Sequence, residues 1–336
     1  MANTLAKAWG RIMNVLSLFN GMSFGKMALE SLDIKITNYY SSEIDKYANQ
    51  ATQALFPDTI QLGDVTRWRD WDIDWASIDL VTGGFPCQAW SMAGKQLGDK
   101  DERGMLFWTM LAIMKHIQSV NPKVNFMIEN VKMKKEFEEY ITTHTENTLG
   151  KVYKILINSA LVSAQNRNRY YWTSFEVEQP GNKGILLQNI LETGIVDREK
   201  AYALTARYYK VGNGNINRYA NKSSDQVVFE VFGLTDTCIA KFKRYKVKFI
   251  EHDNLKAKVL TAGDYTKLGK YGNYLQSIGE GNKVRKLTPR ECFRLQTVPE
   301  HHIDTLLNAG ISNTQLYKMC GNGWTMDVIA HIFKGL

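Results

Sequence analysis

The cysteine in the motif Gly83-Gly84-Phe85-Pro86-Cys87-Gln88 is the residue with the clearest potential for chemistry. The segment before it, 77–82, is a short apolar run that predicts a buried strand. Two glycines and a proline then predict a sharp, stiff turn at the carboxyl end of that strand. Open α/β sheets carry their ligand sites at this edge. An isolated cysteine is more often a small buried apolar residue than a nucleophile, so the motif by itself leaves both interpretations open.

A carboxylate and two arginines could complete a nucleophilic site around Cys87. Addition of a thiolate to carbon 6 of a pyrimidine makes carbon 5 enamine-like, so that carbon 5 can take a methyl group from a sulfonium cofactor. Glu129 follows the apolar segment 124–128, and a carboxylic acid there could promote the addition by a hydrogen bond to ring N3. Cys87 must react as a thiolate, and Arg167 and Arg169 could supply the nearby cation. The two arginines alternate along an extended segment and should point the same way. Taken singly, Glu129 could be a strand-end salt bridge or a helix cap, and the arginines a solvated pair.

The loop after the first predicted strand could bind a cofactor. Residues 13–19 predict that strand, and glycines 21 and 25 precede a predicted helix, so backbone N–H groups face an incoming ligand. Glu43, at the end of the second predicted strand, could take the two hydroxyls of a ribose. Asp64, after the third strand, could accept a hydrogen bond from an exocyclic amine. The glycine spacing departs from G-x-G-x-x-G, so a dinucleotide is not favoured. A loop that needs small residues only for packing is the alternative.

The elements that must position these residues alternate along the first half of the chain. Apolar patterns predict strands at 13–19, 37–41, 77–82, 124–128 and 151–158, and helices starting at 26 and spanning 45–55 and 105–118. This alternation predicts parallel β-α-β units, hence an α/β fold with a Rossmann-like, doubly wound sheet. Residues 175–285 are rich in Gly, Asn, Lys and Tyr and predict a smaller, irregular lobe. Thr288, Pro289 and Glu291 predict a capped helix start, and 324–333 predict a final helix.

Composition narrows the class of protein. The chain has 336 residues, 44% of them hydrophobic, and a formal net charge of +8, which favours a polyanionic partner. No signal peptide or long apolar run is present, so a soluble, intracellular protein is expected. The four cysteines form no CxxC pair and the six histidines no ligand-spaced cluster, so neither a disulfide framework nor a metal site is expected.

These motifs, in this order, resemble those of the cytosine-5 DNA methyltransferases, and the match covers nearly the whole predicted catalytic lobe. The matching segments are Phe19-Asn20-Gly21 with Gly25, Glu43, Gly63-Asp64-Val65, the cysteine motif 83–88, Glu129-Asn130-Val131, Arg167 with Arg169, 285–291 with 294–296, and Gly321-Asn322-Gly323. Two positions depart from the family pattern. Ser23 stands where the family commonly has glycine, and Asn322-Gly323-Trp324 replaces Asn-Ser-Val, a feature more like the eukaryotic de novo branch.

The resemblance implies a DNA (cytosine-5-)-methyltransferase of the prokaryotic or phage type, with the S-adenosylmethionine-dependent fold. Its substrates would be S-adenosyl-L-methionine and double-stranded DNA, with the target cytosine flipped out of the duplex and attacked by Cys87. The implied domains are a catalytic and cofactor-binding domain (11–174), a target-recognition lobe (175–285) and a C-terminal segment returning to the catalytic domain (286–336). Cytoplasmic localisation in a bacterial or phage-infected cell is expected, without membrane or metal, and a cognate restriction endonuclease is a candidate partner. The oligomeric state and the target sequence stay open.

The resemblance also implies roles for individual residues. The catalytic residues are Cys87, Glu129, Arg167 and Arg169. The cofactor-binding residues are Phe19, Asn20, Gly21, Met22, Ser23, Gly25, Glu43, Ile44, Asp64, Val65, Pro86, Leu106, Asn322, Gly323 and Trp324. The DNA-binding residues are Gln88, Ser91, Arg103, Lys243, Arg244, Lys246, Thr261 and Arg290. The glycine-containing loop 91–103 would close over the flipped base.

The basic segment 241–248 could lie along a phosphate backbone, or it could be a solvated edge strand protected by lysines. Arg207, Tyr208, Tyr209, Lys210 and Arg218 could join the same surface. Two functions other than DNA methylation fit parts of the pattern. An RNA cytosine methyltransferase could use the same scaffold, and a catalytically inactive paralogue could bind DNA, although the presence of Cys87 and Glu129 argues against the second.

Overall fold

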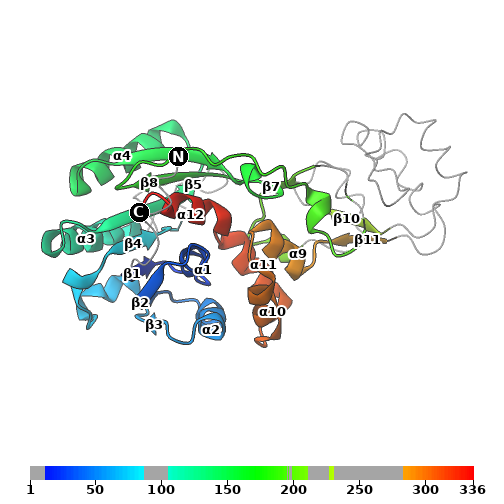
Figure 1. Ribbon diagram of the computed structural model, residues 1–336, viewed down its shortest axis with the longest axis horizontal. Helices are drawn as coiled ribbons and strands as arrows, with labels where there is room; N and C mark the ends of the chain where they lie inside the picture. The colour runs from blue at the N-terminus through cyan, green and yellow to red at the C-terminus, as the bar shows by residue number, and fades with distance from the viewer. Residues whose placement is uncertain (1–11, 87–104, 195, 197–198, 211–226, 231–282) are drawn as a thin grey trace, which may run out of the picture.

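A seven-stranded, mostly parallel sheet forms the centre of the molecule (Figure 1). The computed structural model describes residues 12–86, 105–194, 196, 199–210, 227–230 and 283–336. The strand order is β3-β2-β1-β4-β5-β8-β6. The bounds are β1 Ile12–Leu18, β2 Lys35–Ser42, β3 Ile60–Gln61, β4 Leu80–Gly83, β5 Asn125–Val131, β6 Tyr153–Asn158 and β8 Asn168–Thr173.

The direction of the strands confirms the predicted α/β fold and adds one feature. Strands β3, β2, β1, β4 and β5 pair in parallel, whereas β8 is antiparallel to both β5 and β6. The chain order reverses between β1 and β4, and a reversal of this kind places a ligand crevice at the carboxyl ends of the strands. The sequence patterns predict neither β8 nor the helices α4, α10 and α11.

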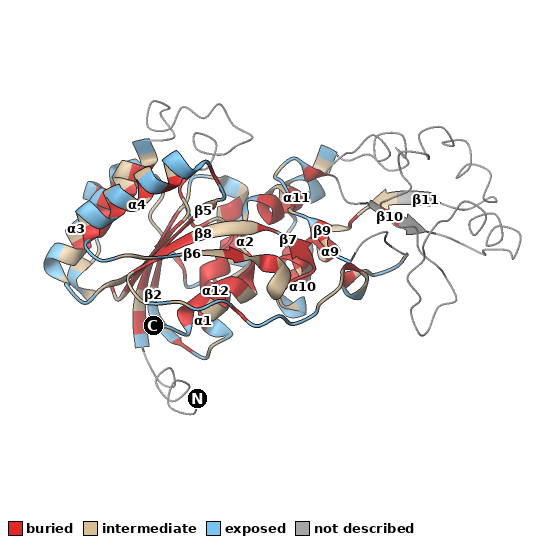
Figure 2. Ribbon diagram, turned by 90° about the horizontal axis from the view of Figure 1, so that it is seen from above, coloured by how far each residue is buried: buried red, intermediate tan, exposed pale blue. Residues whose placement is uncertain are grey.

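Helices cover both faces of the sheet. On one face lie α1 (Phe24–Glu30), α2 (Lys46–Leu55) and α12 (Met326–Phe333), and on the other lie α3 (Met105–Val120) and α4 (Lys135–Leu149). Neighbouring residues of a strand point to opposite faces of the sheet. Val15 packs on the side of α1, α2 and α12, Leu16 packs on the side of α3 and α4, and both are fully buried. The red, buried stretches of Figure 2 follow these strands between the two helical layers.

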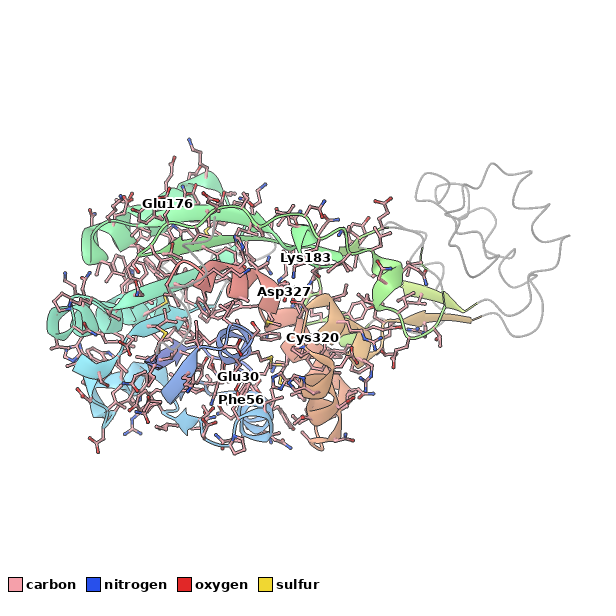
Figure 3. The ribbon with its side chains drawn as sticks, in the orientation of Figure 1. Glu30, Phe56, Glu176, Lys183, Cys320 and Asp327 are labelled. Carbon is pink, nitrogen blue, oxygen red and sulfur yellow. The ribbon has the colours of Figure 1, made fainter. Side chains whose placement is uncertain are left out.

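The second half of the chain adds short elements around the helices α9 (Pro289–Leu295), α10 (Glu300–Asn308) and α11 (Asn313–Asn322). Strand β7 (Gln165–Asn166) pairs with β9 (Ala201–Tyr202), and β10 (Val227–Glu230) pairs with β11 (Lys283–Lys286). The 3₁₀ turns are η2 Val65–Asp70, η3 Trp75–Ser77, η6 Ser159–Leu161, η7 Leu187–Ile190 and η8 Tyr208–Lys210. An ion pair of 2.6 Å between Lys183 and Asp327 holds the segment after β8 against α12 (Figure 3).

The start of α9 confirms the predicted capping box. The Thr288 hydroxyl accepts a hydrogen bond from the Glu291 N–H, and the Glu291 carboxylate accepts one from the Thr288 N–H. Glu291 is fully buried and also pairs with Arg285, at 2.7 Å, so its charge is compensated. The limits proposed at 174/175 and 285/286 stay predictions, since most of the intervening segment lies outside the described residues.

No helix within the described residues is both long enough and apolar enough to span a bilayer. Across the same residues, no three His, Cys, Asp or Glu side chains group as the ligands of a metal ion would.

Candidate active site

Three strand ends meet at the point where the sheet order reverses. Leu18 at the end of β1 lies beside Gly83 of β4, and Gly83 lies beside Ile128 of β5. The residues that follow them, Phe19, Gly84 and Glu129, therefore come together at one edge. The cofactor loop, the start of the cysteine motif and the glutamate motif therefore lie at the same edge of the sheet.

Glu129 is held at both of its carboxylate oxygens. The Oε1 atom lies 2.9 Å from Arg169 Nε, and Oε2 accepts a hydrogen bond of 3.2 Å from the indole Nε1 of Trp324. The Glu129 residue is 9% exposed, so its charge is largely shielded from water yet compensated by the guanidinium. Tyr171 lies opposite Glu129 on β8; burial raises the pKa of its phenol, and the Glu129 carboxylate raises it further.

Arg167 and Arg169 have different partners within this cluster. Arg167 is 2% exposed and donates hydrogen bonds to the backbone carbonyls of Leu204, Gly321 and Gly323, at 3.0, 3.2 and 2.8 Å. Arg169 pairs with Glu129 instead. Arg167 therefore anchors the segment that precedes Trp324, while Arg169 holds the carboxylate that Trp324 also contacts.

Gly84 is required for close packing. A Cβ atom at this position would lie 3.1 Å from Glu129 Oε2 and 3.1 Å from Trp324 Nε1, so a side chain would press on their hydrogen bond. Among the described glycines with positive φ, neither Gly83 nor Gly84 is found. Neither glycine is therefore needed for a left-handed backbone; Gly83 belongs to β4, where a Cβ would meet Met110 at 2.9 Å.

The loop after β1 is braced by its own polar side chains. Asn20 Nδ2 donates to Ser23 Oγ at 2.8 Å, and Ser23 Oγ lies 3.0 Å from the hydroxyl of Thr52 on α2. Ser23 has φ +67°, a left-handed conformation that favours glycine. These hydrogen bonds stabilise a serine in that conformation.

The Glu43 carboxylate connects the loop after β1 with the loop after β2 by hydrogen bonds. Its Oε2 accepts a hydrogen bond from the Gly21 N–H, and its Oε1 accepts from the N–H groups of Ile44 and Asp45, each at 2.8 Å. A carboxylate has about four acceptor positions, so one stays available for a ligand hydroxyl. The Ile44 side chain beside it is 77% exposed, which is unusual for an apolar residue and suits contact with a planar ring.

The other described residues predicted to bind the cofactor lie near the same edge of the sheet and differ in solvent exposure. Asp64 is exposed and caps η2 by accepting a hydrogen bond from Thr66 N, whereas Val65 is buried. Met22 is also buried, at 1% exposure, so only its backbone could reach a ligand. Phe19, Pro86 and Leu106 are partly buried. The exposed apolar and carboxylate groups on neighbouring strand ends fit a nucleoside, as S-adenosylmethionine requires.

The segment Gly321-Asn322-Gly323 fits a narrow space. A Cβ at Gly321 would lie 2.2 Å from the backbone of Thr205, and a Cβ at Gly323 would lie 2.1 Å from the Phe24 ring on α1. Only glycine fits at both positions. Asn322 between them is exposed. The segment thus packs the end of α11 against the cofactor loop, which brings Trp324 to the site.

The DNA-contact predictions are only partly covered by the described residues. Arg290 pairs with Glu192, Glu300 and Asp304, at 3.5, 2.7 and 2.5 Å, so its guanidinium already has carboxylate partners. Tyr208 is 3% exposed and accepts a hydrogen bond from Leu287 N, so it belongs to the core and does not join a DNA surface. The predicted residues outside the described part of the chain are Cys87, Gln88, Ser91, Arg103, Arg218, Lys243, Arg244, Lys246 and Thr261.

The hydrogen bond from Trp324 to Glu129 is the main feature that sequence reasoning missed. The sequence signal was the replacement of Asn-Ser-Val by Asn-Gly-Trp, which introduces a donor that valine lacks. The two residues are 195 positions apart, so no local pattern could pair them.

Comparison with known proteins decides the family. The family model for C-5 cytosine-specific DNA methylase matches residues 13–336, nearly the whole chain. The chain belongs to this family. It is therefore a DNA (cytosine-5-)-methyltransferase, and this methylase uses S-adenosylmethionine to methylate cytosine in DNA. The match includes both the strand-end site and the C-terminal helices that complete it.

Individual relatives agree with this assignment. The methylase is 31% identical to the type II methyltransferase M1.ScrFI of Lactococcus lactis subsp. cremoris, over 94% of this chain and 75% of the relative. It is 28% identical to the type II methyltransferase M.HhaI of Haemophilus parahaemolyticus, over 95% and 93%. An orphan methyltransferase of Bacillus phage SPR, M.SPRI, is 26% identical over 96% and 97%.

Solved structures confirm the fold. The methyltransferase EhMeth of Entamoeba histolytica aligns with a TM-score of 0.64 at 16% identity, over 96% of this chain and 97% of that one. A DNMT2 mutant of Spodoptera frugiperda aligns with a TM-score of 0.61 at 17% identity, over 96% and 98%. At these identities the likeness concerns the arrangement of the sheet and helices.

Proposed function

We propose that this methylase acts on carbon 5 of a cytosine flipped out of duplex DNA, through a covalent adduct with Cys87. The observation that carries the proposal is the position of Glu129. Its carboxylate is fixed by Arg169 and Trp324, and Oε2 lies 3.1 Å from the Cβ position of Gly84, three residues before Cys87. A carboxyl group and a thiol are the two groups that attack on a pyrimidine requires.

The reaction then follows from these groups. The Cys87 thiolate adds to carbon 6, which places electron density on carbon 5, while Glu129, as the carboxylic acid, donates a hydrogen bond to ring N3 and offsets the developing charge. S-adenosylmethionine, when bound, would supply the methyl group to carbon 5 and leave as S-adenosylhomocysteine. A base then removes the carbon 5 proton, the bond between carbon 6 and sulfur breaks, and the thiolate is released. Glu43 and Ile44 would hold the nucleoside part of the cofactor, and the Gly21 loop its amino-acid part.

Methyl transfer tests the substrate. Purified protein is incubated with tritiated S-adenosylmethionine and either duplex DNA or tRNA. Label should enter DNA and be recovered as 5-methylcytosine. Labelled tRNA with unlabelled DNA would instead support the RNA methyltransferase alternative, and no label in either would support the inactive DNA-binding paralogue.

Replacement of the nucleophile tests the mechanism. Cys87→Ser should lower methyl transfer to background, because an alcohol is not ionised near neutral pH, while S-adenosylmethionine binding measured by calorimetry is retained. Cys292→Ala is the matched control: Cys292 is buried in α9, burial raises the pKa of its thiol, and activity should be kept. DNA containing 5-fluorocytosine should give a gel-stable adduct with the unmodified enzyme, since carbon 5 then has no proton to lose. Turnover by the serine variant would refute the nucleophile assignment.

A cognate restriction endonuclease remains a candidate partner, because the relatives include both type II methyltransferases and an orphan enzyme. Bisulfite sequencing of DNA from cells expressing the protein would give the target sequence. Protection of that DNA against an endonuclease of the same specificity would then test the pairing.

A further inference from the structure

The Trp324 indole lies between three parts of the active site. An ideal Cβ at Gly25, at the start of α1, would be 3.5 Å from Trp324 Cζ3, and one at Gly84 would be 3.1 Å from Nε1. The same Nε1 donates to Glu129 Oε2 at 3.2 Å. The ring thus touches the cofactor loop along one edge and the proposed catalytic carboxylate through its only polar atom.

The backbone before Trp324 is fixed independently of the ring. Arg167 donates to the Gly323 carbonyl at 2.8 Å, and Gly323 packs against Phe24 with no room for a side chain. Thr325 on the other side hydrogen-bonds Ser159 and Gln296, at 2.9 and 3.0 Å, and is 1% exposed. The indole therefore has little freedom to leave Glu129, and its direction is set by the fold.

We propose that Trp324 is a positioning residue that holds Glu129 in its reactive orientation and links this orientation to the cofactor loop. The inference rests on the proposed role of Glu129. Arg169 fixes Oε1 and Trp324 fixes Oε2, so the carboxyl plane is set by one donor at each oxygen. Without the indole N–H, Oε2 keeps no donor among the described residues, and the carboxyl group can rotate about its last bond. The ring packing and the N–H make separate contributions, which can be removed one at a time.

Removal of the N–H alone tests the proposal. Trp324→Phe keeps an aromatic ring against Gly25 and Gly84 but removes the donor, as does 3-benzothienylalanine at position 324, which has nearly the shape of tryptophan. A hydrogen bond to a carboxyl group changes the equilibrium between its oriented and free positions by about a factor of ten. We therefore expect kcat for methylation of duplex DNA to fall about tenfold in both variants. The dissociation constant for S-adenosylmethionine and the melting temperature should stay close to those of the unmodified enzyme.

Trp71→Phe is the matched control. The Trp71 Nε1 is buried and has no hydrogen-bond partner among the described residues, so the same change there removes no hydrogen bond and should leave kcat unchanged. A kcat within twofold of the unmodified enzyme in the benzothienylalanine variant would overturn the proposal. Equal losses of kcat and cofactor affinity would overturn it too, since they would place Trp324 in the cofactor pocket only.

Glu129→Gln separates this inference from the function on which it rests. Loss of methylation in that variant together with full activity of the position-324 variants would contradict only the role of Trp324. Retained methylation in Glu129→Gln would contradict the proposed catalytic role of Glu129 itself.

Discussion

Several glycines of this protein lie where a neighbouring group comes close to their backbone. A single added carbon would overlap a neighbour at Gly321 and Gly323 and would make a tight contact of 3.1 Å at Gly84, and none of the three is among the described glycines with positive φ. The space they leave is occupied by Trp324, Phe24 and the backbone at 205–206. At the scale of the residue, the site therefore depends on the absence of side chains as much as on reactive groups.

Gly321→Ala should destabilise the fold strongly. The new Cβ would meet backbone atoms of Thr205 and Ala206 at 2.2–2.3 Å, and backbone cannot move aside as a flexible side chain can. Overpacking of this kind costs about 1–3 kcal/mol, and we expect the upper part of this range in urea unfolding.

Gly181→Ala is the control for this change. Gly181 is exposed, and a Cβ there would have no atom within 4 Å, so the free energy of unfolding should stay equal or rise slightly. Equal stability of the two variants would contradict the proposed packing at Gly321.

Helix α2 shows how one element is tied to a distant one. Asp45 caps its start by accepting hydrogen bonds from Tyr47 N and Ala48 N, at 2.9 and 3.3 Å, and its second oxygen pairs with Lys318 of α11 at 2.7 Å. The Asp45 side chain thus joins the cofactor-binding half of the sheet to the C-terminal helices. Burial tends to raise its pKa, but the hydrogen bonds from Lys318 and the two N–H groups outweigh burial and lower the pKa.

Asp45→Ala should cost about 1 kcal/mol at pH 7, mostly through the lost helix cap, since the partly exposed ion pair is screened by solvent. The carboxylate has a lower pKa in the folded state than in the unfolded chain. Its contribution is therefore complete above the unfolded value of about 3.9 and disappears as the pH falls through the lower folded value. Urea unfolding of both proteins at pH 7 and below pH 4 measures this.

The difference between wild type and Asp45→Ala should shrink in acid. Asp72→Ala provides the comparison, since Asp72 is exposed and its carboxylate has no hydrogen bond or ion pair with another described residue. A difference at Asp45 that does not change with pH would contradict the role of its charge.

A buried polar network around Gln296 joins segments that are far apart in the sequence. Its Nε2 donates to the Cys320 carbonyl at 2.6 Å, and its Oε1 accepts from Gln165 Nε2 and from the Thr325 hydroxyl, at 2.9 and 3.0 Å. These groups come from the segment before β8, from the end of α9, from α11 and from the start of α12. The network therefore attaches α9, α11 and the start of α12 to β7, and it includes Thr325, the neighbour of Trp324.

Gln296→Met should destabilise the protein by roughly 3 kcal/mol, because methionine fills a similar volume but loses three buried hydrogen bonds, each of which contributes about 1 kcal/mol. Thermal and urea unfolding would measure the loss. Gln179→Met is the control: Gln179 is exposed and makes a single hydrogen bond to Leu156 O, so its replacement should change stability by less than about 1 kcal/mol. If both variants lose the same stability, the network does not contribute as described.

The sequence by itself determined the local elements and the order of the motifs. The strand before Gly21, the capping box at Thr288 and the strand ending at Glu129 follow from short-range patterns of apolar residues, caps and turns. Because parallel strands end at a common edge, their motifs could also be assigned to one site from the order of the predicted strands alone. The family resemblance is confirmed across residues 13–336.

Only the tertiary structure decided which groups complete that site. The reversed strand β8 brings Arg169 to Glu129, and the C-terminal helices bring Trp324 to the same carboxylate. Neither contact has a local signal, because a hydrogen bond between residues 195 positions apart depends on how whole layers pack. The same reason applies to Gly84, because the close neighbour that favours its small size, Trp324, comes from the other end of the chain.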